Sequence, residues 1–193
     1  MNDKSKIVIR SLIYIVLFLS FLPNSISQGI AIGEWRDHLP YTHCTSVTEG
    51  DGVIYGSTQN AVFSLNTSDN SLERITKINS LSDVGVSRIK YHSGLKLLFV
   101  AYTNGNIDLL QEDQLINISD IKRTPMTGSK AINNILFIGN NAYLSCGFGI
   151  VLLDLSKKEI KDTYYIGTNG TRIEIFDLAQ DGTKFFAATE SGV

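Results

Sequence analysis

Residues 98–110 read LFVAYTNGNIDLL, two apolar runs joined by a polar turn that contains Asn-Gly. The same plan returns three times, at residues 53–65 (VIYGSTQNAVFSL), 142–154 (AYLSCGFGIVLLD) and 185–193 (FFAATESGV). Two short apolar runs joined by a tight turn are typical of a β-hairpin. The turn residues of the four copies are Asn60, Gly105, Gly149 and Gly192. They lie 45, 44 and 43 positions apart, and a propeller blade repeats every ~40 to 45 residues.

The sequence therefore predicts an all-β fold, a β-propeller of four-stranded antiparallel blades with a period of about 44 residues. The expected strands are 42–48, 53–58, 61–65 and 72–75, then 86–91, 97–102, 106–110 and 115–118, then 132–138, 142–145, 150–155 and 160–166, and finally 173–178 and 184–189. A strand within 30–36 is expected to complete the last blade. Because closed propellers have about four to eight blades, we expect residues 28–193 to be a propeller domain that is incomplete at its C-terminus.

The first 27 residues have the composition of a signal peptide. Lys4, Lys6 and Arg10 precede an apolar run at 12–22, and Ser25-Ile26-Ser27 offers small residues for cleavage. An uncleaved membrane anchor is the alternative, but the run is shorter than the ~20 residues that cross a bilayer. We expect residues 1–27 to be removed and the protein to be exported.

Composition excludes several classes of function. The chain is 43% hydrophobic and 19% charged, with a formal net charge of -2, so it lacks the basic excess of a nucleic-acid-binding surface. Its two cysteines, Cys44 and Cys146, fall two blades apart, so we expect both to be free and mostly buried. His38, His43 and Cys44 do not have the spacing of a metal site.

No catalytic motif is found either. Asn104 to Asp108 has oxygen ligands at alternate positions, but Leu109 and Leu115 occupy the places where a calcium loop needs Gly and Glu. The chain has no Gly-x-Ser-x-Gly, no Walker glycine loop and no His-Glu-x-x-His. We therefore predict no metal, no cofactor and no enzymatic activity.

Charged residues divide between the two faces that a ring of such blades would have. The turns between the first and second and between the third and fourth strands of each blade form one face, which is acidic: Glu49, Asp51, Asp69, Glu112, Asp113, Glu159 and Asp181 stand against Lys96, Lys157 and Lys158. The central turns and the links between blades form the other face, which is basic: Lys77, Lys122, Arg123, Lys130 and Arg172 stand against Asp83 and Asp120. These five basic residues are the predicted anion-binding site.

Four segments resemble the N-terminal propeller of the PorZ family of the type IX secretion system. They are IGEWRDHLPY at 32–41, LSDVGVSRIKY at 81–91, YTNGNIDLL at 102–110 and residues 131–167, which include AYLSCGFGIV. Blade geometry does not require NGNIDLL or the AYLS to FGIV segment, so the resemblance is more specific than the repeat alone.

The resemblance implies a component of an attachment complex at the outer-membrane cell surface. Its partners would be the sortase and other attachment-complex proteins of the type IX system, and it would present anionic lipopolysaccharide to that sortase. The alternative is the periplasmic sensor propeller of a hybrid two-component regulator, with which Ser80-Leu81-Ser82-Asp83 is compatible. A third possibility is a secreted carbohydrate-active enzyme.

Overall fold

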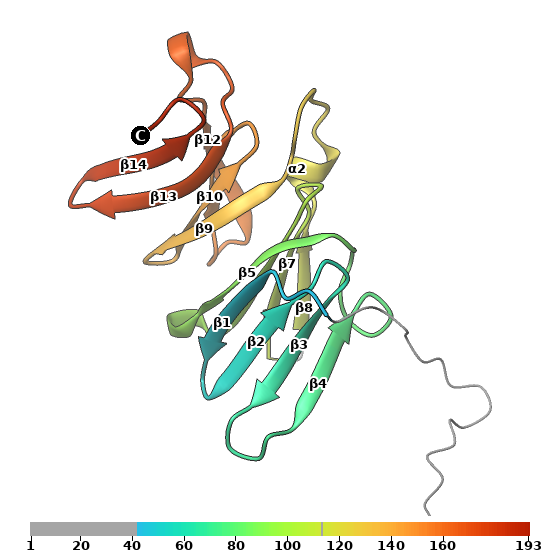
Figure 1. Ribbon diagram of the computed structural model, residues 1–193. Helices are drawn as coiled ribbons and strands as arrows, with labels where there is room; N and C mark the ends of the chain where they lie inside the picture. Colours follow the sequence, from blue (N-terminus) through green and yellow to red (C-terminus); the bar gives the residue numbers. More distant parts are fainter. Residues whose placement is uncertain (1–41, 113) are drawn as a thin grey trace, which may run out of the picture. The chain divides into compact units, whose positions relative to one another are not determined.

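The computed structural model describes residues 42–112 and 114–193, and all of them belong to the unit Leu39–Val193. Three four-stranded sheets follow one another along the chain, each a meander of consecutive antiparallel strands (Figure 1). The first sheet consists of β1 (Ser46–Gly50), β2 (Val53–Ser57), β3 (Ala61–Asn66) and β4 (Leu72–Thr76). The second consists of β5 (Val86–His92), β6 (Leu97–Tyr102), β7 (Ile107–Gln111) and β8 (Gln114–Ile118).

The third sheet repeats this order, and a two-stranded sheet follows it. The third sheet consists of β9 (Ile132–Ile138), β10 (Asn141–Cys146), β11 (Gly149–Asp154) and β12 (Glu159–Tyr164), and the last of β13 (Ile175–Asp181) and β14 (Lys184–Thr189). The helices of the described residues are single turns: η1 (Ser93–Leu95), α2 (Asp120–Arg123) and η2 (Thr168–Gly170). None of them is long and apolar enough to cross a membrane. The predicted all-β propeller blades are confirmed.

The largest hydrophobic cluster lies between the second and third sheets. Phe99 and Leu109 on one sheet and Ile135, Leu144 and Leu153 on the other belong to it, and all five are fully buried. Burying such a side chain contributes about 1.5 to 3 kcal/mol. Smaller clusters join the first sheet to the second and the third to the last. Each sheet therefore buries its apolar faces against its neighbours in the sequence.

The first strand of each sheet has one edge that no strand of its own sheet pairs. Polar side chains from the preceding sheet bond to that edge: Ser46 Oγ donates to the Ile89 carbonyl at 3.2 Å, Ser87 Oγ to that of Ile132 at 2.8 Å, and the Asn133 amide to that of Ile175 at 2.9 Å. An unpaired edge group that is buried costs free energy. These bonds remove that cost and align neighbouring sheets through β1, β5, β9 and β13.

The structure corrects two expectations, the burial of Cys44 and the start of the first strand. Cys44 and Cys146 are both free, but only Cys146 is buried. Cys44 is exposed because β1 begins at Ser46 and not at residue 42, so this cysteine precedes the sheet.

The predicted signal peptide, the strand at 30–36 and Asp113 lie outside the described residues.

The two thiols should differ in reactivity. Burial raises the pKa of Cys146 far above its usual value, and the reactive species is the thiolate. In the folded protein we expect a thiol reagent to modify Cys44 alone, with Cys146 reacting only after denaturation. Titration with a chromogenic disulfide should report one group per native chain and two per unfolded chain. Two fast groups in the native protein would contradict this placement of Cys146.

Candidate functional site

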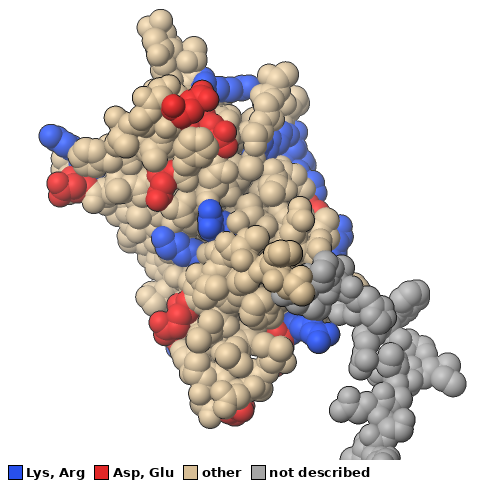
Figure 2. Space-filling model, in the orientation of Figure 1, with Lys and Arg blue, Asp and Glu red and all other residues tan. Residues whose placement is uncertain are grey.

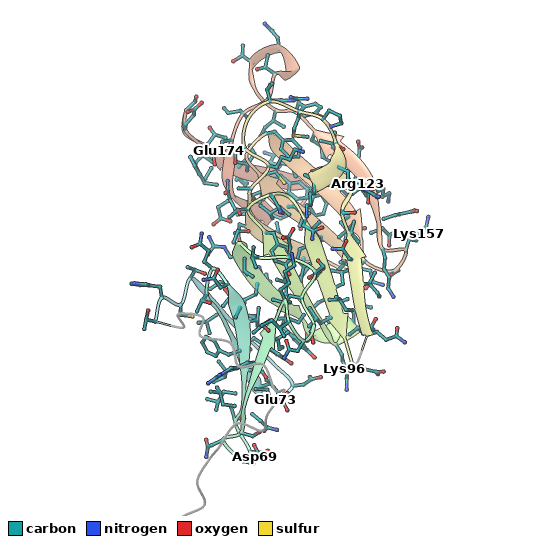
Figure 3. All side chains as sticks on the ribbon, turned by 90° about the vertical axis from the view of Figure 1, so that its right-hand side faces the viewer. Asp69, Glu73, Lys96, Arg123, Lys157 and Glu174 are labelled. Atoms are coloured by element: carbon teal, nitrogen blue, oxygen red, sulfur yellow. The ribbon has the colours of Figure 1, made fainter. Side chains whose placement is uncertain are left out.

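The basic face is built from the link between the first two sheets, the central turn of the second sheet, and α2. On the face shown in Figure 2, Lys and Arg side chains form small separate groups on a mostly uncharged surface. Figure 3 places Arg123 toward one end of the molecule and Lys96, Glu73 and Asp69 toward the other. Lys157, in the turn between β11 and β12, lies nearer to Arg123 than to Lys96 in this view, so the turns of the acidic set are not all at one end.

Asp83 is the charge around which the predicted basic residues gather. It lies in the link between the first two sheets and is only 7% exposed. Lys122 Nζ on α2 donates to its carboxylate at 2.6 Å, and Lys77 Nζ lies 3.9 Å away. The Asn104 amide adds a bond at 2.8 Å. Two of the five predicted residues therefore share one buried carboxylate.

Several hydrogen bonds lower the pKa of Asp83. Burial acts to raise this pKa, but the bonds from Lys122, Asn104 and the Val84 N–H outweigh burial and lower the pKa to about 2. Since the carboxylate stays ionised at neutral pH, it keeps the Lys122 ammonium in place.

A second buried carboxylate, Asp108 on β7, holds the neighbouring residue of the same link. Ser82 donates to it twice, from its N–H at 2.8 Å and from its Oγ at 2.6 Å. Tyr102 donates its hydroxyl at 2.6 Å and Asn117 its amide at 2.8 Å. Burial, and then the bond to Asp108, raise the pKa of Tyr102 far above its usual value, so Tyr102 remains a donor. Each acceptor of Asp108 is satisfied without a metal.

Asn106 connects the two carboxylates. Its amide donates to Ser82 Oγ at 2.9 Å and lies 3.5 Å from Asp83 Oδ2, while its side-chain oxygen accepts from Asn117 at 3.0 Å. The segments LSDVG at 81–85 and NGNID at 104–108, which both belong to the family resemblance, are therefore bonded to each other. We call the polar network of Ser82, Asp83, Tyr102, Asn104, Asn106, Asp108 and Asn117 the link clamp.

The turn at Gly105 positions α2. Gly105 has a positive φ of 80°, and a Cβ there would lie 2.6 Å from Ile121, so a larger residue would collide with the helix. Ile121 is itself buried in the main hydrophobic cluster. Its burial anchors α2 and directs Lys122 toward Asp83.

The other three predicted residues are placed differently. Arg123 is 73% exposed and lies 3.7 Å from Asp120. Lys130 Nζ donates to the Lys122 carbonyl at 2.7 Å, which joins it to α2. The Arg172 guanidinium lies 5.7 Å from the centre of the Tyr165 ring, and no bond among the described residues connects it to the other four.

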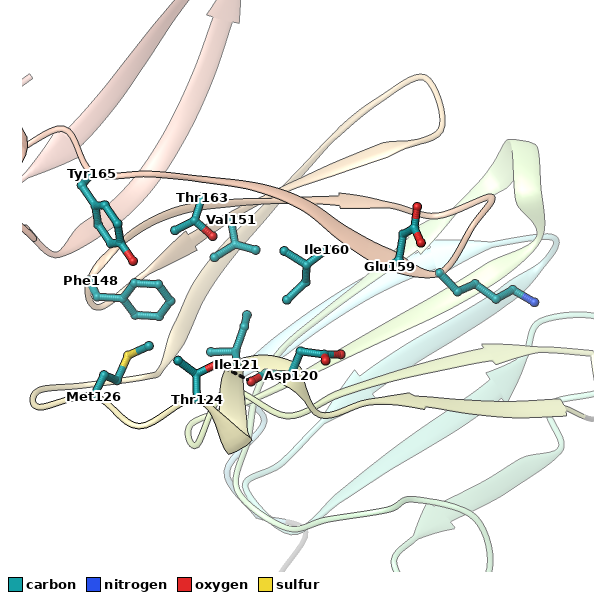
Figure 4. A pocket seen from close by; sticks show the side chains of 11 residues that line it. Asp120, Ile121, Thr124, Met126, Phe148, Val151, Glu159, Ile160, Thr163 and Tyr165 are labelled. Carbon is teal, nitrogen blue, oxygen red and sulfur yellow. Dashed lines mark hydrogen bonds between the residues drawn. The ribbon is translucent and has the colours of Figure 1, made fainter.

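A groove separates α2 from the outer strand of the third sheet (Figure 4). It has a volume of about 380 Å³, with Ile121, Phe148, Val151 and Ile160 as an apolar floor and Asp120 and Glu159 on its rim. Within residues 42–112 and 114–193, no group of three or more His, Cys, Asp or Glu side chains is placed to hold a metal ion.

The sequence does not predict the link clamp. Its charge pattern places Asp83 among the surface charges that oppose the basic residues, and Asn104, Asn106 and Asp108 fit the turn and second strand of a hairpin. One signal was available: NGNIDLL carries polar side chains at alternate positions where a blade needs none. Alternation places Asn106 and Asp108 on one side of the strand.

We expect Asp83→Asn to destabilise the protein by about 2 kcal/mol at pH 7, because the folded-state pKa of Asp83 lies below its usual value of 3.8. A lowered pKa stabilises the folded state above about pH 4, and this stabilisation is lost as the pH falls from about 4 to about 2. Urea unfolding at several pH values should show the two proteins converging over that range. The exposed Asp181→Asn serves as control, and a constant difference down to about pH 2 would contradict the assignment.

The sequence and fold were compared with known proteins. Residues 54–193 match the family of the N-terminal β-propeller domain of PorZ of the type IX secretion system. No curated protein matches the chain. Among solved structures, PorZ, described as an essential bacterial surface component of the type-IX secretion system of Porphyromonas gingivalis, is 28% identical with a TM-score of 0.65. The match covers 76% of this chain and 19% of that chain.

Two further matches show the fold alone. The extracellular domain of BT4673 of B. thetaiotaomicron, described as a one-component system, is 14% identical with a TM-score of 0.62, and the match covers 79% of this chain and 21% of that one. A second structure of BT4673, described as a hybrid two-component system, is also 14% identical. The computationally designed Ika4 protein is 10% identical with a TM-score of 0.59, over 81% of this chain and 91% of its own. Since the family match extends from the first sheet to the last and includes the whole link clamp, the chain belongs to the family of PorZ N-terminal β-propeller domains.

Proposed function

We propose that this chain is part of a non-enzymatic cell-surface component of the type IX secretion system, which presents anionic lipopolysaccharide to a partner sortase. The observation that carries the proposal is the family match, supported by 28% identity to a PorZ whose description names it a surface component of that system. The chain spans 19% of that protein, so the partners and the ligand are proposals for the whole protein.

The basic face supports the anionic ligand. Lys77, Lys122, Arg123 and Lys130 gather around the link clamp and α2, where Asp83 and Asp120 oppose them. The Lys122 ammonium is committed to Asp83, whereas the side chains of Lys77 and Arg123 are 55% and 73% exposed. Exposed Lys and Arg side chains suit phosphate groups. Arg123 and Lys130 are therefore the best residues to change, because removal of Lys122 would also break its 2.6 Å bond to the buried Asp83 carboxylate.

The hybrid two-component sensor is not favoured. The extracellular domain of the BT4673 hybrid system shares 14% identity, which is half of the identity to PorZ. That level of similarity supports a common fold and carries no information on signalling.

The double variant Arg123→Gln with Lys130→Gln tests the ligand. We expect about tenfold weaker binding of the purified protein to immobilised anionic lipopolysaccharide at ~50 mM salt, and a smaller difference at ~300 mM, where exposed charges are screened. Surface plasmon resonance measures both. Lys96→Gln with Lys184→Gln removes two exposed positive charges, neither of which lines the groove beside α2, and should bind as the unchanged protein does. Equal losses in both variants, or no loss in the first, would exclude the basic face as the binding site.

A further inference from the structure

A second groove opens on the acidic face, between the first and second sheets. Cross-strand neighbours form its two walls: Tyr55, Ser64 and Glu73 on the first sheet, and Tyr91, Leu98 and Leu110 on the second. Its volume is about 360 Å³. Figure 3 shows Glu73 and Lys96, which both line it, at the same end of the molecule. None of the link-clamp residues and none of the five predicted basic residues lines this groove.

Two stacked tyrosines give the groove an aromatic surface. The rings of Tyr55 and Tyr91 are nearly parallel, at 11°, with their centres 5.7 Å apart. Tyr91 donates its hydroxyl to Asp51 at 3.0 Å. Burial, followed by Asp51, raises the pKa of Tyr91 to about 12, so the phenol remains protonated. The face of a neutral tyrosine ring attracts cations.

Carboxylates outnumber ammonium groups around these rings. Asp51, Glu73 and Glu112 line the groove together with a single cation, Lys96. Lys96 Nζ lies 3.7 Å from Asp51. Among the described residues, Glu73 and Glu112 have no partner of opposite charge. Two negative charges are therefore available to a ligand.

The wall of the groove also contains a hydroxyl that has no hydrogen-bond partner among the described residues. Ser64 is 8% exposed and lines the groove, yet its Oγ makes no hydrogen bond with any other described side chain or backbone group. This oxygen is open to the groove, since Ser64 Oγ is not among the fully buried polar atoms that lack a partner. A donor that enters from the groove could therefore bond to it.

We propose that the groove binds a lysine or arginine side chain of a partner polypeptide. The ammonium or guanidinium group would lie against the tyrosine rings, balance the free carboxylates of Glu73 and Glu112, and donate a hydrogen bond to Ser64. Charge complementarity identifies the occupant: a neutral ligand would leave both carboxylates unpaired, and an anionic one would be repelled.

A capped hexalysine peptide serves as the probe, titrated calorimetrically into the purified protein at ~20 mM salt, where charge attraction is least screened. Glu73→Gln with Glu112→Gln should weaken binding about tenfold. The matched control, Glu159→Gln with Asp181→Asn, removes two negative charges elsewhere on the acidic face and should change binding by less than about twofold. All four residues are exposed, so both variants should fold.

Ser64→Ala tests the groove without altering charge. Loss of the acceptor should weaken hexalysine binding several-fold, since hydrogen bonds to charged groups are the stronger ones, while the melting temperature should not fall because no internal bond is lost. If both charge variants weakened hexalysine binding equally, the peptide would be attracted by the negative charge of the whole surface and not by this groove, and the proposal would be overturned. Unchanged binding by Ser64→Ala, or tighter binding of maltohexaose than of hexalysine, would also overturn it.

Discussion

The structure depends on one constraint: each sheet is apolar on its faces and has an unpaired first strand, and only the neighbouring sheet can cover both. The hydrophobic cluster of Phe99, Leu109, Ile135 and Leu144 covers the faces. Ser46, Ser87 and Asn133 cover the edges, each by a bond to a backbone carbonyl of the next sheet. Because hydrophobic burial has no preferred direction, the polar edge bonds are what fix the lateral position of one sheet against the next.

The link clamp pairs polar groups of the connections at the ends of the strands. A connection that crosses from the outer strand of one sheet to the inner strand of the next carries backbone groups that no strand pairs. Asp108 accepts the Ser82 N–H, and Asp83 is held by Lys122 from the following connection. Successive connections thus stabilise each other, and the exposed side chains of Lys77 and Arg123 lie beside these connections. On the acidic face, Asp51 accepts from Tyr91 and lies near Lys96, whereas Glu73 and Glu112 have no partner of opposite charge among the described residues.

Much of the fold could be predicted from the sequence. The hairpins at 53–65, 98–110 and 142–154 form because alternation and turn chemistry are local properties, and they are β2–β3, β6–β7 and β10–β11. The sequence predicts the start of β1 too early. The Thr45 N–H still bonds to the Ser57 carbonyl, but the pairing of β1 with β2 begins only at Ser46. The site was less predictable. Charge and turn position placed Lys77, Lys122 and Asp83 on one face, but the burial of Asp83 and the unpaired hydroxyl of Ser64 depend on packing between sheets.

The edge bonds also bear on how such a chain acquires its structure. Each of them joins residues separated by about one repeat: 43 positions for Ser46 and Ile89, 45 for Ser87 and Ile132, and 42 for Asn133 and Ile175. No described bond of this kind has to wait for a distant part of the sequence. Folding can therefore propagate from one repeat to the next. A chain that emerges from a ribosome or a membrane channel with its N-terminus first would complete one interface as each new repeat arrives, and only a short length of apolar sequence would be unprotected at any time.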